Sequence, residues 1–241
     1  MNNPYITVIT ACYNSEKTIT KTLESICAQT NRDFEYIIVD GKSSDKTIEI
    51  IEKYKKILND QLIYVSERDQ GIYDAMNKGI RMSSGKLISF IGSDDWYEKD
   101  CFQNVYDLGI DSEYQVLYGG MKFYNNSLEE KAVMYNHQFL SKQMICHGAS
   151  FTTRKCFEKF GMFDLGYKSA ADYDFMLRLY SSGEVEFTPI HKFLGNVLQG
   201  GTSSSRFARI EKTKVQYKYG YISRGGMIKE TIKAYGAQIL G

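Results

Sequence analysis

The most constraining part of the sequence is Leu87–Tyr97, in which a short apolar run ends at two adjacent carboxylates. Its first part, Leu87–Ile91, predicts a buried strand, and the Gly-Ser pair after it predicts a turn. Ligands of an open α/β sheet bind outside the carboxyl ends of the strands, where Asp94 and Asp95 are expected. Adjacent carboxylates need a positive partner, and Mg²⁺ or Mn²⁺ is the usual one. The alternative is that Ser-Asp-Asp caps a helix.

Composition is that of an ordinary globular protein, with 241 residues, 43% hydrophobic and 24% charged. No apolar run approaches the roughly 18 residues of a membrane span. The N-terminus lacks the basic and apolar regions of a signal peptide. The five cysteines show no CxxC spacing and indicate reduced thiols of a cytoplasmic protein, with neither a disulfide framework nor a zinc site.

Charge is distributed unevenly along the chain. Residues 206–241 contain eight basic and two acidic residues and carry +6, so residues 1–205 carry −5 of the total of +1. Tyrosines alternate with lysines and an arginine in this basic segment, which suits an anionic membrane surface. We expect peripheral contact with the inner face of the cytoplasmic membrane, and a solvated helix face or a homodimer contact is the alternative. The acidic body argues against nucleic-acid binding.

Strands and helices alternate through the first hundred residues. Apolar runs predict strands at 5–10, 34–40, 62–66 and 87–91. Helical spacing predicts helices after Asn14 or Ser15, after Asp45 and at 72–83. This alternation predicts right-handed βαβ units and a parallel sheet in an α/β fold.

Periodicity is weaker after residue 98. We expect one domain over residues 1–205, with halves at 1–98 and 99–205, followed by a basic helical extension at 206–241. The further elements expected are helices at 100–108, 153–160 and 172–180, a strand at 115–118, a hairpin or mobile loop at 122–139, a return to the sheet at 145–152 and a loop at 199–205.

Nucleotide chemistry is constrained by the first strand–helix turn, Thr10–Asn14. It contains no glycine, so neither GxGxxG nor the P-loop motif is present. Asp40, Asp69 and the Asp94–Asp95 pair all follow strand ends and lie on one edge of the predicted sheet. A single Asp there is commonly a turn residue. Four on one edge are harder to explain as turn residues alone. A diphosphate bound here would need its charge neutralised, and Asp94 and Asp95 with a divalent cation would do this.

Five segments resemble one enzyme family. The sequence is similar to the family 2 inverting glycosyltransferases, with a Rossmann-like GT-A fold, of the type that builds bacterial surface polysaccharides. The resemblance is specific and keeps the family's order. The segments that carry it are 6–14, 37–47, 67–80, 85–95 and 170–179.

The resemblance implies that residues 1–98 bind the nucleotide sugar. Thr10 and Ala11 would line the nucleotide pocket. Asp40 would accept the N–H of the nucleobase, and Asp69 would lie near the base or the ribose. Asp94 would face the ribose.

It also implies a cation, Mn²⁺ or Mg²⁺. Asp95 would ligate the metal directly, and Asp94 would face its water shell. Gly92 stands where many members carry an acid. The cation would therefore have fewer protein ligands and would depend more on the diphosphate.

Residues 99–205 would bind the acceptor. Asp172 would be the general base, and His147 would contact the acceptor, although Gly148 replaces the Gln that often follows. Asp174 is close enough in sequence to be an alternative general base. Residues i and i+2 of a helix point about 200° apart, so only one of the two aspartates can face the substrate. Helix angles alone do not decide between them, and the family match favours Asp172.

The activity implied is metal-dependent transfer of a sugar from a nucleoside-diphosphate sugar to a hydroxyl of a glycan or a polyprenyl-diphosphate-linked saccharide, in polysaccharide, O-antigen (lipopolysaccharide) or capsule synthesis. A UDP-sugar is expected, with GDP- and dTDP-sugars open. One alternative is a sugar-nucleotide nucleotidyltransferase, but its Gly-rich, Arg-containing loop is missing. The other is a non-catalytic nucleotide-sugar-binding subunit, which would have little need for both Asp95 and Asp172.

Overall fold

The structure, a computed structural model, describes residues 3–125, 128–199 and 206–236. Its strands are β1 (Ile6–Cys12), β2 (Phe34–Asp40), β3 (Leu62–Ser66), β4 (Leu87–Phe90), β5 (Trp96–Tyr97), β6 (Gln115–Asn125), β7 (Leu128–Val133), β8 (Ser150–Thr153) and β9 (Glu186–Leu198). Its helices are α1 (Ile19–Cys27), α2 (Thr47–Leu58), α3 (Ile72–Met82), α4 (Cys101–Leu108), α5 (Arg154–Phe160), α6 (Ala171–Ser182), α7 (Arg206–Lys218) and α8 (Arg224–Gly236).

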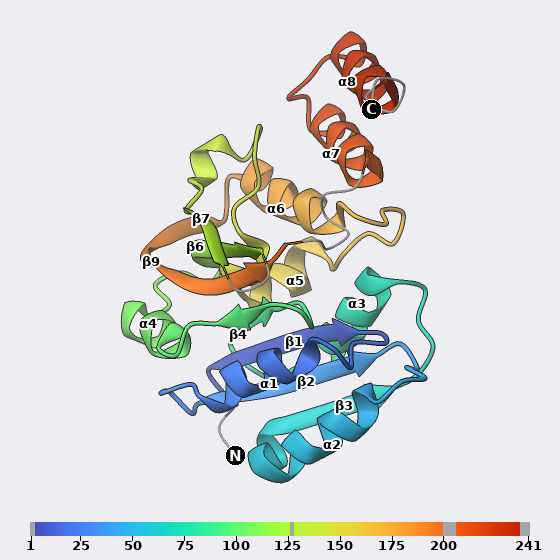
Figure 1. The fold of residues 1–241 in the computed structure, drawn as a ribbon. Helices are drawn as coiled ribbons and strands as arrows, with labels where there is room; N and C mark the ends of the chain where they lie inside the picture. Colours follow the sequence, from blue (N-terminus) through green and yellow to red (C-terminus); the bar gives the residue numbers. More distant parts are fainter. Residues whose placement is uncertain (1–2, 126–127, 200–205, 237–241) are drawn as a thin grey trace.

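One mixed sheet runs through the body, with strand order β3-β2-β1-β4-β8-β6-β9-β5 and β7 paired to β6 (Figure 1). The four strands from β3 to β4 are parallel, as the strand–helix alternation predicts. Successive residues of β1 supply both faces: Ile6 and Val8 pack in the core under α1, α2 and α4, whereas Ile9 packs under α3, α5 and α6. Burial on both faces explains why these strands read as nearly continuous apolar runs.

The second half of the sheet is largely antiparallel. β8 pairs antiparallel with β4 and with β6, so the predicted return of 145–152 to the sheet is confirmed. Residues 122–139 hold the β6–β7 hairpin, one of the two predicted alternatives. β9 was not predicted; it pairs parallel with β6 and antiparallel with β5. The α/β prediction is confirmed, with a less parallel sheet than expected.

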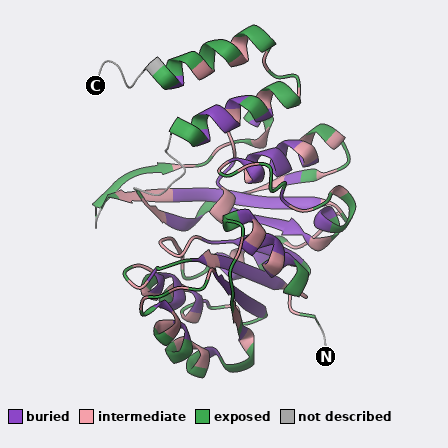
Figure 2. Ribbon diagram, turned by 90° about the vertical axis from the view of Figure 1, so that its right-hand side faces the viewer, coloured by how far each residue is buried: buried purple, intermediate pink, exposed green. Residues whose placement is uncertain are grey.

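The basic segment begins with α7, which packs against α6 and places Val215 in the core (Figure 1). α8 packs on α7, lies farthest from the sheet and is mostly exposed (Figure 2). The predicted loop at 199–205 lies outside the described residues except for Gln199. The expected domain boundary, between residues 205 and 206, falls at the end of this loop. Among the helices that are described, none is long and apolar enough to cross a membrane.

Candidate active site

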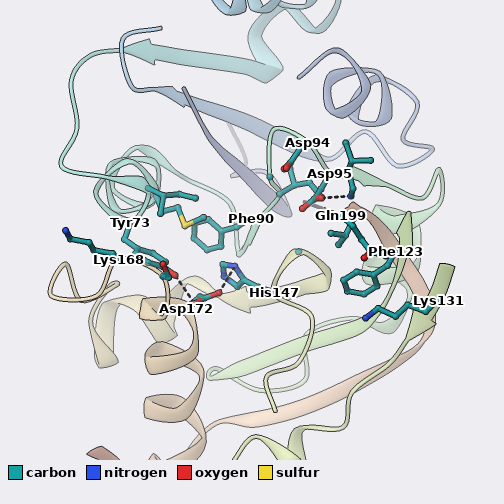
Figure 3. A pocket seen from close by; sticks show the side chains of 18 residues that line it. Tyr73, Phe90, Asp94, Asp95, Phe123, Lys131, His147, Lys168, Asp172 and Gln199 are labelled. Atoms are coloured by element: carbon teal, nitrogen blue, oxygen red, sulfur yellow. Dashed lines mark hydrogen bonds and ion pairs between the residues drawn. The ribbon is translucent and has the colours of Figure 1, made fainter. Parts of the chain in front are cut away.

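A cleft of about 440 Å³ opens at the carboxyl end of β4. Figure 3 shows the Asp94–Asp95 pair at one side and Asp172 at the other, with Phe90 and His147 between them. Its lining residues come from both halves of the chain: Ile72, Tyr73, Met76, Phe90, Ile91, Gly92, Asp94, Asp95, Phe123, Lys131, His147, Gly148, Lys168, Ser169, Asp172, Val197, Leu198 and Gln199.

The Asp94–Asp95 pair lies in the turn between β4 and β5. Burial raises the pKa of Asp94. Burial and then the charge of Asp94 raise the pKa of Asp95 from 3.8 to about 8, against the effect of a hydrogen bond of 3.2 Å that the Leu198 backbone N–H donates to Asp95 Oδ1. Neither carboxylate forms an ion pair with a Lys or Arg in the part of the chain that the structure describes. Among the described residues, no cationic side chain therefore offsets a negative charge on either carboxylate.

This pair fits a divalent cation. A Cβ built at Gly92 would lie 2.7 Å from Asp94 Oδ1 and 2.9 Å from Asp95 Oδ2, so both carboxylates converge on the space that only glycine leaves open. Carboxylate oxygens are the ligands that Mg²⁺ and Mn²⁺ prefer. Across residues 3–125, 128–199 and 206–236, no group of three or more His, Cys, Asp or Glu side chains could hold a metal by itself. A cation at Asp94 and Asp95 would need further ligands from substrate or water.

Asp172 lies in the first turn of α6 and lines the cleft. Its Oδ1 accepts a hydrogen bond of 2.9 Å from the Tyr73 hydroxyl and another of 2.9 Å from the Tyr173 backbone N–H. Burial and the Asp172 charge raise the pKa of Tyr73, which therefore stays protonated as a donor. These two bonds fix the orientation of the carboxylate through Oδ1. Neither of them engages Oδ2.

The structure separates the two aspartates of α6. Asp174 is fully buried on the side away from the cleft, where its oxygens lie 2.7 Å from Arg178 Nη2 and 2.6 Å from Lys218 Nζ. It therefore joins α6 to α7.

His147 lies beside Asp172, with 3.9 Å between its Nδ1 and Asp172 Oδ2. Its ring stacks on Phe90 with centroids 5.2 Å apart. Burial lowers the pKa of His147 below 6.5 despite the nearby Asp172 charge, so the imidazole is neutral at neutral pH. A neutral ring offers hydrogen bonding to a polar ligand without repelling a cation.

A second cleft lies beyond the ends of β2 and β3 and is lined by Tyr13, Gly41, Lys42, Arg68 and Asp69. Asp69 Oδ1 accepts a hydrogen bond of 2.9 Å from the Gly71 backbone N–H. Its Oδ2 lies only 2.8 Å from where a Cβ of Gly41 would be. The absence of a side chain at Gly41 therefore lets the Asp69 carboxylate enter this cleft.

The other predicted nucleotide residues lie outside both linings. Asp40 is fully buried, and it accepts hydrogen bonds from the Ser43 backbone N–H and hydroxyl and from the Ser66 hydroxyl, the last at 2.6 Å. The hydroxyl of Thr10 donates to the Ile91 carbonyl at 2.9 Å, and Ala11 is half-buried on β1. Asp40 thus ties the end of β2 to Ser43 and to the end of β3, and Thr10 ties β1 to the residue after β4.

Several lining residues were not assigned by sequence reasoning. Tyr73 lies in the segment 67–80 that carries the family resemblance, but the resemblance assigns it no function. Phe123 and Lys131 come from the β6–β7 hairpin, where Lys131 Nζ lies 4.8 Å from the Phe123 ring centroid. The pairing of β6 with β9 positions this hairpin, and no local pattern in the sequence reveals that pairing.

Sequence comparison finds related enzymes. A family model described as Glycosyl transferase family 2 matches residues 7–179. A PGL/p-HBAD biosynthesis glycosyltransferase of Mycobacterium bovis is 31% identical over 208 residues, which cover 85% of this chain and 81% of the relative. Chondroitin synthase of Escherichia coli is 28% identical over 225 residues, 87% of this chain and 31% of that protein.

Solved structures share the fold at lower identity. S. aureus TarS 1–349 in complex with UDP-GlcNAc has a TM-score of 0.72 and 20% identity, covering 96% of this chain and 71% of that one. The mannosyltransferase PcManGT from Pyrobaculum calidifontis, in complex with GDP-Man and Mn²⁺, has a TM-score of 0.65 and 18% identity, covering 100% and 76%. The prediction of a GT-A fold is confirmed.

Proposed function

We propose that this chain, which belongs to glycosyl transferase family 2, moves a sugar from a nucleoside-diphosphate sugar to a hydroxyl group and inverts the anomeric carbon. The observation that carries the proposal is one cleft with the Asp94–Asp95 pair at one side and Asp172 at the other (Figure 3). An inverting displacement needs a base on one face of the sugar and a stabilised leaving group on the other. The UDP-GlcNAc and GDP-Man complexes of the structural neighbours support a nucleotide-sugar donor.

Asp172 is the general base of this proposal. Its Oδ2 takes the proton of the acceptor hydroxyl while the acceptor oxygen bonds to the anomeric carbon, and the bond from that carbon to the diphosphate oxygen breaks with its electron pair. Tyr73 and the Tyr173 backbone hold Oδ1, so the carboxylate keeps one orientation. General-base assistance of this kind contributes about 10²–10⁴-fold. Neutral His147, beside Oδ2, is suited to orient the acceptor hydroxyl.

Asp94 and Asp95 are assigned to Mn²⁺ or Mg²⁺. A bound cation would act as a Lewis acid toward the departing diphosphate. Their convergence over Gly92 and their raised pKa values support this assignment. Asp95 is oriented for it by the Leu198 backbone N–H.

We place the nucleobase in the second cleft and favour uracil. With one oxygen engaged by Gly71, Asp69 has its other oxygen left for a ligand N–H. Uracil presents one N–H between two carbonyl groups, which matches a carboxylate flanked by the cationic Lys42 and Arg68. Guanine presents adjacent donors instead. Tyr13, 64% exposed, offers a ring for stacking. Since the oxygens of Asp40 are already occupied, the contact with the base falls to Asp69.

The acceptor is proposed to be a glycan or a polyprenyl-diphosphate-linked saccharide at an anionic membrane surface. On α8, the exposed side chains of Ile228, Ile232 and Tyr235 form one stripe at helical spacing, beside Lys229 and Lys233. Exposed apolar side chains beside cations suit contact with an anionic membrane surface. Ile232→Glu should weaken salt-sensitive co-sedimentation with phosphatidylglycerol vesicles. Unchanged binding would exclude this face.

Two measurements test the activity. A thermal-shift panel of UDP, GDP and dTDP with Mn²⁺ identifies the nucleotide, because a ligand of the folded state raises its stability. Incubation with the matching nucleotide sugar then identifies the reaction from its products. Release of nucleoside diphosphate supports a transferase, and release of pyrophosphate would indicate a nucleotidyltransferase. No release from any nucleotide sugar would leave only a binding protein.

A further inference from the structure

Glu211 of α7 is a buried carboxylate that binds one wall of the cleft. Only 4% of its surface is exposed. Both of its oxygens accept from the Lys168 backbone N–H at 3.0 Å, and Oε2 also accepts from the Ser169 backbone N–H at 2.7 Å. Lys168 and Ser169 line the cleft, and Asp172 follows them within one helical turn.

Local sequence does not provide this support. The nearest aspartates bind other amides, because Asp164 Oδ1 accepts from the Gly166 backbone N–H and Asp172 Oδ1 accepts from the Tyr173 backbone N–H. Glu211 forms no ion pair with a Lys or Arg among the residues described, so its hydrogen-bonding capacity is directed to the Lys168 and Ser169 amides.

α7 also holds α6 on the far side of Asp172. Lys218 Nζ lies 2.6 Å from Asp174 Oδ1, and the Tyr219 hydroxyl donates to the Asp174 carbonyl at 3.3 Å. The turn that carries Asp172 is therefore fixed before and after that residue by groups in or next to one helix. This helix lies outside residues 7–179, which the family model matches.

We infer that Glu211 is a positioning residue for sugar transfer. By binding the amides of Lys168 and Ser169, it fixes the wall against which an acceptor rests and the direction from which Asp172 meets the acceptor oxygen. The inference rests on the proposed function. It makes α7 part of the active site, while α8 remains the surface element.

The expected effect follows from the contacts that are lost. Glu211→Ala leaves the Lys168 and Ser169 amides without this buried acceptor, and the segment moves to find new partners. A displacement of about 1 Å near reacting groups can cost about 10²-fold. We therefore expect kcat to fall by about 10- to 100-fold with little change in the KM of the donor, because the nucleotide contacts lie on other elements. Glu211→Gln retains one carbonyl acceptor, so its kcat should fall less than that of Glu211→Ala.

The test uses the full chain, with Gln216→Ala as the matched control. Gln216 lies on the same helix and donates to the Ser141 carbonyl at 2.9 Å, away from the cleft lining. Turnover of UDP-GlcNAc with Mn²⁺, or of the nucleotide sugar that the panel selects, is measured well below each melting temperature. Amide hydrogen exchange of the peptide over residues 163–172 is measured in parallel.

Faster exchange of this peptide and a lower kcat in Glu211→Ala, but neither change in Gln216→Ala, would support the inference. Unchanged exchange in Glu211→Ala would overturn it. So would faster exchange with normal kcat, since Glu211 would then be only structural. An inactive wild-type protein would overturn the proposed function and, with it, the role in transfer. The exchange result would still decide whether Glu211 holds the cleft wall.

Discussion

Asp95 should make the free energy of unfolding fall as the pH rises through neutrality. Burial and the Asp94 charge raise its pKa from 3.8 to about 8. Between these values the folded protein keeps a proton that the unfolded chain has released, so rising pH favours unfolding. The stabilisation that protonated Asp95 gives to the folded state is complete below the pKa of 3.8 expected in the unfolded chain, and it is lost by about pH 8. One proton corresponds to about 1.4 kcal/mol per pH unit, with the full slope expected between about pH 5 and 7.

The same proton should compete with a metal ion for this carboxylate. With a pKa of about 8, roughly one hundredth of Asp95 is ionised at pH 6 and roughly one tenth at pH 7. Because metal ligands must be deprotonated, the apparent affinity for Mn²⁺ should rise about tenfold per pH unit and level off above pH 8.

Chemical denaturation in EDTA at about pH 5, 6, 7 and 8 measures the slope for wild type and for Asp95→Asn. The exposed Asp60, outside the cleft lining, gives the matched control Asp60→Asn. Because burial of Asp94 also contributes to the absolute slope, the difference between variants is the readout. Asp95→Asn should be flatter by up to about 1.4 kcal/mol per pH unit, whereas Asp60→Asn should follow wild type. Equal slopes for all three proteins would refute the reasoning, because Asp95 would then titrate in its ordinary range.

Three substitutions test the other parts of the site. Asp172→Asn should lower turnover by about 10²-fold or more with unchanged donor affinity in titration calorimetry; normal turnover would exclude Asp172 as the base. Asp174→Asn should lower the free energy of unfolding by about 2–3 kcal/mol, since a buried, doubly paired carboxylate is lost while Arg178 and Lys218 can rehydrate; a loss below about 0.5 kcal/mol in chemical denaturation would show that the link is weak. Gly92→Ala should abolish Mn²⁺-dependent nucleotide binding with a near-normal melting temperature, because its Cβ would displace both carboxylates; wild-type affinity for Mn²⁺ would argue against the metal assignment.

Periodicity predicted the part of the fold whose elements are local. β1, β2 and β4 are buried on both faces and therefore read as apolar runs in the sequence. β9 was missed because exposed and buried residues do not alternate regularly along it, and Pro189 lies within it. It is held by pairing with β6, some 70 residues earlier in the chain, which no local pattern reveals.

The site was predictable where a motif and a strand end coincide. Asp94 and Asp95 come four and five residues after the end of β4, so both the turn and its carboxylates could be read from one stretch. Tyr73 bonds to a partner 99 residues away, and Glu211 bonds to amides more than 40 residues away, so neither could be inferred from spacing. For Asp40 the position at a strand end was right, but Ser43 and Ser66 occupy its oxygens, which only coordinates reveal.

The stereochemistry of sugar release tests inverting transfer by Asp172 most directly. In the absence of an acceptor, water can take the sugar from an α-linked donor such as UDP-GlcNAc with Mn²⁺, and proton NMR in the first minutes reports the anomer formed. The wild-type protein should release UDP together with the β-anomer, and Asp172→Asn should release neither at a comparable rate. First appearance of the α-anomer, or equal release by Asp172→Asn, would contradict an inverting displacement assisted by this carboxylate.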